Sequence, residues 1–297
     1  MHTDPEGHPG GHRLGPHVVG QRVVVRRVLP GETGPSGGPA MTDVLGTCVR
    51  WSDGECVVQP EDGPAVVIPL SLIVSGKPVP PRPSPRFRVD PRECQLRAMT
   101  LWPDIVTEPL GAWLLRDSAT STARRANSVM AFGPAGVPDA YERVVAHYER
   151  PVANVLPDSP EDALFRDRGW VTEGREADTV FMMASASRVV RTLPPALPTA
   201  RLESAGPGLV RAVVDDVAAG FAAYADDWVG FRGLEVAPTH RGRGLALAVM
   251  AALVEWGTAQ GATTAYLQVL GDNTAARRVY EPLGFAPHHS YRYLTPG

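Results

Sequence analysis

The chain has 297 residues, of which 43% are hydrophobic and 21% are charged, with a formal net charge of −3. These proportions are typical of a globular protein with two or three domains, and the slight negative charge argues against broad binding to nucleic acid or anionic membranes. No apolar run approaches the roughly 20 residues of a membrane span, and the N-terminus lacks the apolar core of a signal peptide. We therefore expect a cytoplasmic protein with neither nucleic-acid nor membrane partners.

The cysteines and the N-terminal histidines do not predict a metal site. Cys48, Cys56 and Cys94 are odd in number and have no metal-ligand spacing, so we expect buried, reduced thiols. Residues 1–16 are rich in Gly, Pro and His and contain almost no apolar side chain. Such a composition predicts a disordered, solvated tail.

Residues 17–76 alternate short apolar runs with turn residues, including an Asp-Gly pair at 53–54. Short strands about ten residues apart predict a small β-barrel, and their order resembles an SH3-like module. A peptide-binding role and a structural role both remain open for it. Residues 77–90 contain five prolines among several basic residues, which predicts an extended, semi-stiff linker.

Residues 91–190 carry weaker signals. Helices are expected near residues 93–102 and 138–150, and strands near residues 111–116 and 126–132. Residues 163–170, followed by an apolar run at 179–183, repeat the order of a helix, a glycine, an aromatic residue and a strand that also ends the chain.

The most informative stretch is residues 234–246, Leu-Glu-Val-Ala-Pro-Thr-His-Arg-Gly-Arg-Gly-Leu-Ala. Pro238 cannot donate to a sheet, so a strand should end just before it. Residues 245–260 lack proline and repeat apolar residues at helical spacing, which predicts a helix. The first N–H groups of a helix have no internal partner and attract anions, and Arg241 and Arg243 add positive charge. We expect a phosphate-binding turn.

Two motifs, one strand apart, resemble the GCN5-related N-acetyltransferase (GNAT) superfamily. The acyl-CoA motif Gln/Arg-x-x-Gly-x-Gly/Ala matches Arg241, Gly244 and Ala246, and the motif Asn-x-x-Ala-x-x-x-Tyr-x-x-x-Gly-Phe begins at Asn273 and ends at Phe285. The whole chain is similar to an actinobacterial tandem-GNAT type with an SH3-like N-terminal domain, on a pattern of Trp-Leu-Leu-Arg at 113–116 and Arg-Ala-Asn-Ser at 125–128.

The resemblance implies an α/β (α+β) GNAT fold, with a mixed, mostly antiparallel sheet and flanking helices, and acetyl-CoA as cofactor. It implies cofactor contacts from the following residues: Leu234, Val236, Arg241, Gly242, Arg243, Gly244, Leu245, Ala246, Asn273, Ala276 and Tyr280. An N–H near Val236 would stabilise charge on the acyl oxygen, and the Tyr280 phenol would protonate the departing thiolate.

The general base is not marked by any motif. Glu235 is nearest to the thioester in sequence, with Asp226 and Asp227 as alternatives that also fit hairpin turns, and His240 is expected to be a loop residue. Pro282, in place of a polar residue, predicts that the helix holding Tyr280 ends before it.

The expected division of the chain is the following: a tail at 1–16, an SH3-like barrel at 17–76, a linker at 77–90, a degenerate GNAT half at 91–190 and an acetyl-CoA-binding GNAT domain at 191–297. In an alternative division, residues 91–190 supply the first strand and helices of one larger catalytic domain. The expected function is transfer of an acetyl group to a primary amine of a small molecule or a protein. The alternative is a non-catalytic acyl-CoA sensor or scaffold whose SH3-like module binds a partner.

Overall fold

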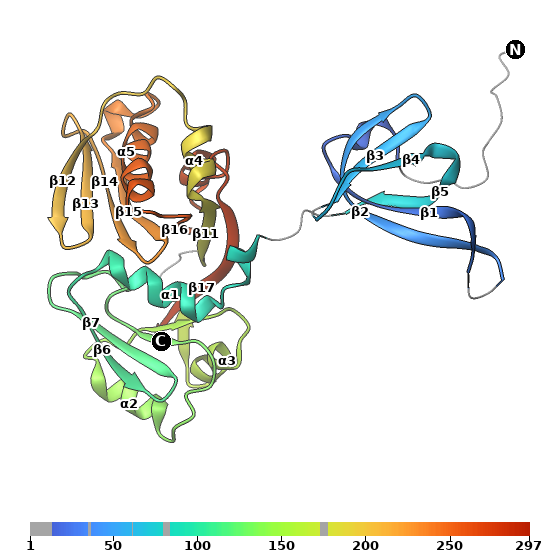
Figure 1. Cartoon of the computed structure of the whole chain (residues 1–297). Helices are drawn as coiled ribbons and strands as arrows, with labels where there is room; N and C mark the ends of the chain where they lie inside the picture. The colour runs from blue at the N-terminus through green and yellow to red at the C-terminus, as the bar shows by residue number, and fades with distance from the viewer. Residues whose placement is uncertain (1–13, 35–36, 61, 80–83, 173–177) are drawn as a thin grey trace, which may run out of the picture. The chain divides into compact units, whose positions relative to one another are not determined.

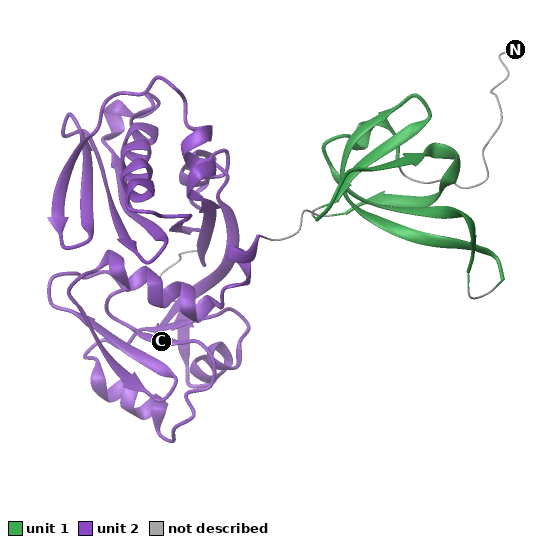
Figure 2. Cartoon of the chain, viewed as in Figure 1, with its two compact units in different colours: residues 1–83 green, residues 84–297 purple. Residues whose placement is uncertain are grey.

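The computed structural model describes residues 14–34, 37–60, 62–79, 84–172 and 178–297. The chain divides into two compact units, residues 1–83 and residues 84–297 (Figure 2). Most of the expected tail, residues 1–13, and the centre of the expected linker, residues 80–83, lie outside the described residues. Among the helices of the described residues, none is long and apolar enough to cross a membrane.

Unit 1 is an antiparallel sheet with strand order β4-β3-β2-β1-β5 (Figure 1). Its elements are η1 (Pro16–Val18), β1 (Arg22–Thr33), β2 (Pro39–Ser52), β3 (Glu55–Pro60), β4 (Val66–Pro69), η2 (Leu70–Leu72) and β5 (Ile73–Pro78). Asp53 and Gly54 both have positive φ, at 53° and 78°, as a two-residue hairpin turn requires. The expected antiparallel strands and the Asp-Gly turn are therefore confirmed, whereas the SH3-like assignment stays a prediction.

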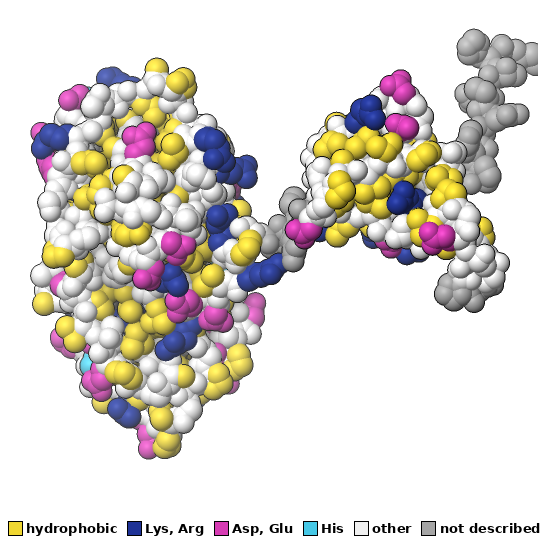
Figure 3. All heavy atoms as spheres, in the orientation of Figure 1, with side chains coloured by type: hydrophobic (Ala, Val, Ile, Leu, Met, Phe, Trp, Pro, Cys, Tyr) yellow, Lys and Arg dark blue, Asp and Glu magenta, His cyan; other side chains and the backbone are white. Residues whose placement is uncertain are grey.

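The core of unit 1 contains two of the three cysteines. Cys48 and Cys56 are fully buried together with valines of β1 and Ile68, and their sulfurs lie 3.9 Å apart. Cys48, Cys56 and Cys94 are all free and buried, so the prediction of reduced thiols is confirmed. Hydrophobic side chains also occupy much of the face of unit 1 seen in Figure 3. The large exposed ones in this unit are Val19, Met41, Leu45, Val49, Val67 and Val74.

Unit 2 is built on one extended sheet with helices on both faces. Its first part has η3 (Pro85–Arg88), α1 (Pro91–Ala98), η4 (Met99–Leu101), β6 (Ile105–Leu110), β7 (Trp113–Ser118), β8 (Val129–Ala131), α2 (Ala140–His147), β9 (Ala153–Val155), α3 (Pro160–Arg166), β10 (Trp170–Thr172), β11 (Thr179–Ser185) and α4 (Ala186–Thr192). Its second part has β12 (Arg201–Gly206), β13 (Leu209–Val214), β14 (Ala218–Ala225), β15 (Trp228–Val236), η5 (Pro238–His240), α5 (Leu245–Ala259), β16 (Thr264–Leu270), α6 (Thr274–Tyr280) and β17 (Ala286–Pro296).

Among the described residues, the strands of unit 2 form a 12-stranded sheet in the order β12-β13-β14-β15-β16-β11-β17-β9-β8-β7-β6, with β10 paired to β17. Only β15–β16 and β8–β9 pair in parallel in this set; the other pairs are antiparallel. This is the mixed, mostly antiparallel sheet that the GNAT resemblance implied. The expected hairpin turn at Asp226-Asp227 is also confirmed, since it joins β14 to β15, and Asp215-Asp216 forms a second such turn between β13 and β14.

The two expected halves of this unit share strands. Residues 179–185, assigned from sequence to the first half, form β11, which lies between β16 and β17 of the second half. Strand β17 in turn pairs with β9 and β10 of the first half. The physical reason is that β11 is apolar on both faces: Met182 packs on one side of the sheet, and Phe181 and Met183 pack on the other. Such a strand is stable only inside a sheet.

Each face of the sheet has its own covering elements. Cys94 and Ala98 of α1, with Leu101, pack against Phe181 and Tyr266; we call this side the α1 face. Helices α2 and α3 pack on the opposite side of the first part, and α4 and α5 pack on the opposite side of the second part, which we call the α5 face (Figure 1).

Candidate active site

Strands β15 and β16 separate part-way along their length. They pair in parallel from Trp228 opposite Thr264 to Phe231 opposite Leu267. Beyond that point β15 continues to Val236 and β16 continues to Leu270. Among the described residues, these two strand ends are not paired with each other. The backbone of residues 232–236 therefore presents its β16-side N–H and C=O groups to an opening, where an extended ligand can bind as a strand would.

A β-bulge sets which side chains face this opening. Arg232 lies opposite Phe221 of β14, but Glu235 lies opposite Ala219, so β15 carries one extra residue there. Gly233 adopts φ +59° at the bulge, a conformation that side chains other than glycine rarely adopt. The bulge shifts by one residue the alternation of side chains between the two faces of the sheet. Leu234 therefore packs beside Val249 and Leu253 on the α5 face.

This shift also decides where Glu235 lies. Because Leu234 and Val236 both pack against the core of the α5 face, the intervening Glu235 lies on the α1 face, where it is exposed to solvent. The sequence had left open whether Glu235 pointed into solvent or toward the first half. It lies on the sheet face that residues of the first half cover, without being buried by them.

The turn after β15 has the features expected of a phosphate site. Gly242 and Gly244 have φ of +75° and +76°, and α5 begins at Leu245 with no side chain capping its first N–H groups. Arg241 and Arg243 are exposed on the same turn. Uncapped N–H groups at the positive end of a 15-residue helix, beside two guanidinium groups, favour a bound anion.

Arg241 also joins this turn to the opening. Its Nε donates a hydrogen bond of 3.3 Å to the carbonyl oxygen of Val236. The strand end at 234–236 and the N-terminus of α5 are thus adjacent, as the sequence predicted. A ligand that follows the open edge of β15 reaches the uncapped helix N-terminus next.

The second motif supplies a capped helix. The Asn273 Oδ1 accepts a hydrogen bond of 3.0 Å from the backbone N–H of Ala276, so this side chain caps α6. Helix α6 ends at Tyr280, and the following turn closes at Gly284 with φ +96°. The expectation that the helix ends before Pro282 is confirmed.

Tyr280 is nearly buried, with 9% of its surface exposed, in the core of the α5 face. Its ring meets Phe285 edge to face with centroids 5.9 Å apart. Burial raises the pKa of Tyr280 to about 12, so the phenol stays protonated at neutral pH. Tyr280 therefore packs on the face of the sheet opposite to Glu235.

The alternative bases lie elsewhere. Asp226 and Asp227 form the turn before β15, at the end where β15 and β16 are paired. Asp227 accepts a hydrogen bond from the Thr263 hydroxyl at 2.6 Å, which is the role of a turn residue. His240 ends η5, and its Nδ1 lies 3.0 Å from the Thr239 hydroxyl. Of the candidates, Glu235 is the one beside the opening.

Comparison with known proteins agrees with this geometry. Residues 196–294 match the family model described as "Probable histone acetyltransferase Rv0428c C-terminal". A solved structure of a GCN5-related N-acetyltransferase from Kribbella flavida aligns with a TM-score of 0.53 at 17% identity, over 69% of this chain and 94% of that one. Unit 2 has the GNAT fold.

Two further proteins are similar to the chain. Over 77 residues it is 38% identical to the uncharacterized N-acetyltransferase YobR of Bacillus subtilis (strain 168), and this match covers 25% of the chain and 31% of that relative's length. A tandem GNAT protein from the clavulanic acid biosynthesis pathway aligns with a TM-score of 0.44 at 13% identity, over 72% of this chain and 89% of that one.

Polar residues that the sequence did not mark line the GNAT opening on its α1 face. Arg232 and Gln268 are the first residues of β15 and β16 beyond the paired segment. The Arg232 Nε donates to the Leu101 carbonyl oxygen at 2.8 Å, and its guanidinium lies 4.5 Å from the centre of the Phe221 ring. The Gln268 Oε1 accepts hydrogen bonds from the Tyr291 hydroxyl and from Arg125 Nε.

These residues come from segments up to 166 positions apart, as in the bond of 2.9 Å from Arg125 Nε to the Tyr291 hydroxyl. Their positions are fixed only by β11, β16 and β17 lying side by side. A pattern within one segment therefore could not reveal them. The one local signal was the Arg-Ala-Asn-Ser run at 125–128.

The structure explains that run and its partner, Trp-Leu-Leu-Arg at 113–116. Arg116 is buried and donates from Nη2 to the Ser128 hydroxyl at 2.7 Å and from Nε to the Ser128 carbonyl oxygen at 3.2 Å. Asn127 holds the intervening loop through bonds to the Ser118 N–H and the Ser121 carbonyl oxygen. The pattern thus builds the loop that carries Arg125 to the opening.

Proposed function

We propose that unit 2 is an N-acetyltransferase that transfers an acetyl group from acetyl-CoA to a primary amine. The observation that carries the proposal is the opening between β15 and β16, which leads directly to the uncapped N-terminus of α5. A long ligand with an extended arm and a pyrophosphate matches both parts of this site.

For acetyl-CoA, the residues present fit the two chemically different ends of the molecule. The open backbone edge at Leu234 and Val236 offers amide groups to the pantetheine arm. The N–H groups of residues 242–246, with Arg241 and Arg243, offer donors and positive charge to the pyrophosphate. Asn273 and Ala276 contribute by fixing the start of α6.

The reaction requires one proton to leave the amine and one to reach the sulfur. The amine nitrogen forms a bond to the acetyl carbon while the carbon–sulfur bond breaks. A backbone N–H near Val236 stabilises negative charge on the acetyl oxygen. Tyr280 donates its phenolic proton to the thiolate, and Glu235, directly or through water, accepts the proton from the amine. An acid and a base on opposite faces of the sheet suit this division of roles.

The acceptor enters on the α1 face in this proposal, because Glu235, Arg232 and Gln268 all line the opening there. Residues of the first half form part of its wall: Arg125 contacts Gln268, and the Leu101 carbonyl oxygen holds Arg232. The matching family is described as a probable histone acetyltransferase, so lysine-containing peptides belong in the acceptor panel beside small amines.

Two measurements test the proposal in order. Saturating acetyl-CoA should raise the melting temperature, because a ligand at about 100 times its dissociation constant adds roughly 2.7 kcal/mol to stability. Release of free CoA should then depend on an added amine. An unchanged melting curve with acetyl-CoA would refute the cofactor assignment. Binding without any amine-dependent CoA release across the panel would favour the non-catalytic, acyl-CoA-sensing alternative.

A further inference from the structure

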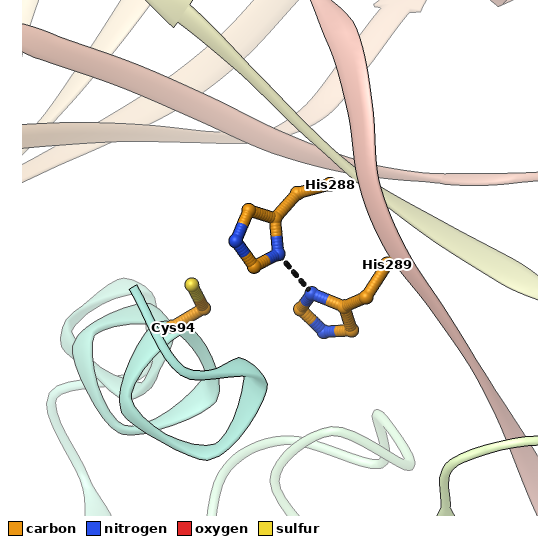
Figure 4. Close-up of side chains that lie close together, drawn as sticks. All are labelled: Cys94, His288 and His289. Carbon is orange, nitrogen blue, oxygen red and sulfur yellow. Dashed lines mark hydrogen bonds between the residues drawn. The ribbon is translucent and has the colours of Figure 1, made fainter. Parts of the chain in front are cut away.

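A cysteine and two histidines converge where α1 crosses β17 (Figure 4). Cys94 lies on α1 and is fully buried, whereas His288 and His289 are consecutive residues of β17. None of the three has a role in the proposed acetyl transfer. The sequence predicted no metal site, because the three cysteines follow no metal-ligand spacing.

Consecutive residues of a strand normally point to opposite faces, but a bulge brings both imidazoles to the same side. Phe181 of β11 lies opposite His289 and Met182 lies opposite Pro287, so His288 is an extra residue in β17. Both rings accordingly contact the Phe181 ring, His289 stacked at 5.0 Å and His288 edge to face at 6.3 Å between centroids. The bulge therefore turns two histidines toward Cys94.

The donor atoms are close enough to share an ion. One donor atom from each of Cys94, His288 and His289 lies within 4.8 Å of the others. The two Nδ1 atoms lie 2.7 Å apart, and the Gln95 amide nitrogen lies 3.2 Å from His289 Nε2. Zinc bonds of about 2.0–2.3 Å in tetrahedral geometry place ligand atoms roughly 3.3–3.7 Å apart. Shifts of about 1 Å or less would convert the cluster into such a site.

The proton positions suit ligation. Because the Gln95 amide donates to Nε2, the hydrogen-bond pattern assigns the His289 proton to Nδ1, which donates to His288 Nδ1. The outer His288 Nε2 is buried without a hydrogen-bond partner among the described residues.

We propose that Cys94, His288 and His289 bind one Zn²⁺ ion, with a water molecule as the fourth ligand. Thiolate and imidazole donors are the set that zinc prefers in proteins. On binding, the Cys94 thiol releases its proton to solvent, and the His289 proton moves from Nδ1 to Nε2. The Gln95 amide then turns so that its oxygen accepts this proton, as the outer nitrogen of a metal-bound histidine requires.

The site would join α1 to β17. Helix α1 covers the α1 face across both parts of the sheet, since Cys94 and Ala98 pack in one cluster with Tyr266 of the second part, while Leu96 packs against the cluster that contains Leu114 and Met130 of the first part. A zinc ion at this crossing would hold α1 in place over the sheet face on which Arg125 and Gln268 lie. The inference needs no catalytic activity and stands apart from the proposed function.

Zinc and cobalt binding to the full chain test this inference. We expect one zinc per chain to remain after removal of free metal. Co²⁺ in its place should give a thiolate-to-cobalt absorption band with the intense visible bands of tetrahedral geometry. Cys94→Ser should lose the thiolate band, and His288→Gln should lose zinc retention. His147→Gln and Cys48→Ser, which lie outside the cluster, are the matched controls and should keep both.

The cobalt spectrum of the wild-type chain keeps the test decisive even where a variant of buried Cys94 fails to fold. The N-terminal histidines at 2, 8 and 12 contain no thiol, so metal bound to them cannot produce the thiolate band. A wild-type chain that lacks this band, or a folded Cys94→Ser variant that keeps zinc at the wild-type level, would overturn the inference. A thiolate band with copper but no retained zinc would overturn the choice of metal.

Discussion

Among the described residues, the two parts of unit 2 contain the same order of elements, but only the second part has the opening. In the first part, β8, α2, β9 and α3 precede β10; in the second part, β15, α5, β16 and α6 precede β17. Both β8–β9 and β15–β16 pair in parallel. In each part the last helix, α3 or α6, is followed by a glycine with positive φ and then an aromatic residue: Gly169-Trp170 after α3 and Gly284-Phe285 after α6. The degenerate first half stays a prediction that rests on this repetition.

The difference lies in strand length and in the turn after the first strand. Strands β8 and β9 have three residues each and are paired from Val129 to Ala131, so no backbone edge remains open between them. Helix α2 has 8 residues against 15 in α5, and its N-cap is Asp139 in place of Gly244. A carboxylate at the positive end of a helix repels a phosphate. By this comparison, the proposed acyl-CoA site requires two strands that extend beyond their paired segment, in addition to the order of elements that both parts share.

The largest expected effect concerns Tyr280, the proposed acid. We predict that Tyr280→Phe lowers kcat by roughly 10²–10⁴-fold with little change in acetyl-CoA affinity, because the hydroxyl acts on charge that develops in the transition state. Steady-state kinetics with an accepted amine measures this effect. Tyr141→Phe, at a tyrosine of α2 in the first half, is the matched control and should keep full turnover. A normal kcat in the Tyr280→Phe enzyme would show that Tyr280 is not the general acid.

The next effect tests the turn that only the second half has. Arg241→Ala or Arg243→Ala should weaken acetyl-CoA binding by roughly 10- to 100-fold, since a hydrogen bond to a charged group contributes about 1.5–3 kcal/mol. Isothermal titration calorimetry gives the dissociation constants. Arg143→Ala, an exposed arginine on α2 of the first half, should leave binding unchanged. If all three variants bind alike, the phosphate site lies elsewhere.

A smaller effect concerns the number of sites. We predict that one acetyl-CoA binds per chain, and that Asp139→Arg, which gives the first half a cationic turn, leaves this number at one. The reason is that β8 and β9 remain fully paired and offer no edge to pantetheine. Calorimetric stoichiometry decides the point. A second equivalent bound to the wild type or to the variant would contradict the comparison.

The smallest effect is the absence of an alkaline decline. Tyr280 must be protonated to act as an acid, and burial raises its pKa to about 12. The acid form therefore persists below that pH, and kcat should not fall between pH 8 and about 10, where an ordinary tyrosine begins to ionise. A pH–rate profile over this range provides the measurement. A fall in kcat with an apparent pKa near 9 would require an acid less buried than Tyr280.

The local sequence determined the parts of the site that depend on neighbouring residues. Helix α5, the glycine turn before it and the end of the motif helix α6 before Pro282 follow from propensity and positive-φ glycines within short segments. These features need no distant partner, so the motifs at 241–246 and 273–285 predicted them correctly.

Only the tertiary structure decided the rest, because it depends on strands that are far apart in sequence. The bulge at Gly233 put Glu235 on the α1 face, and an error of one residue in that alternation would have put it on the other face. The insertion of β11 between β16 and β17 brought Arg125 to Gln268 and His289 to Cys94. Sheet order and bulges are set by packing over the whole unit, and for that reason no single segment of the sequence contains them.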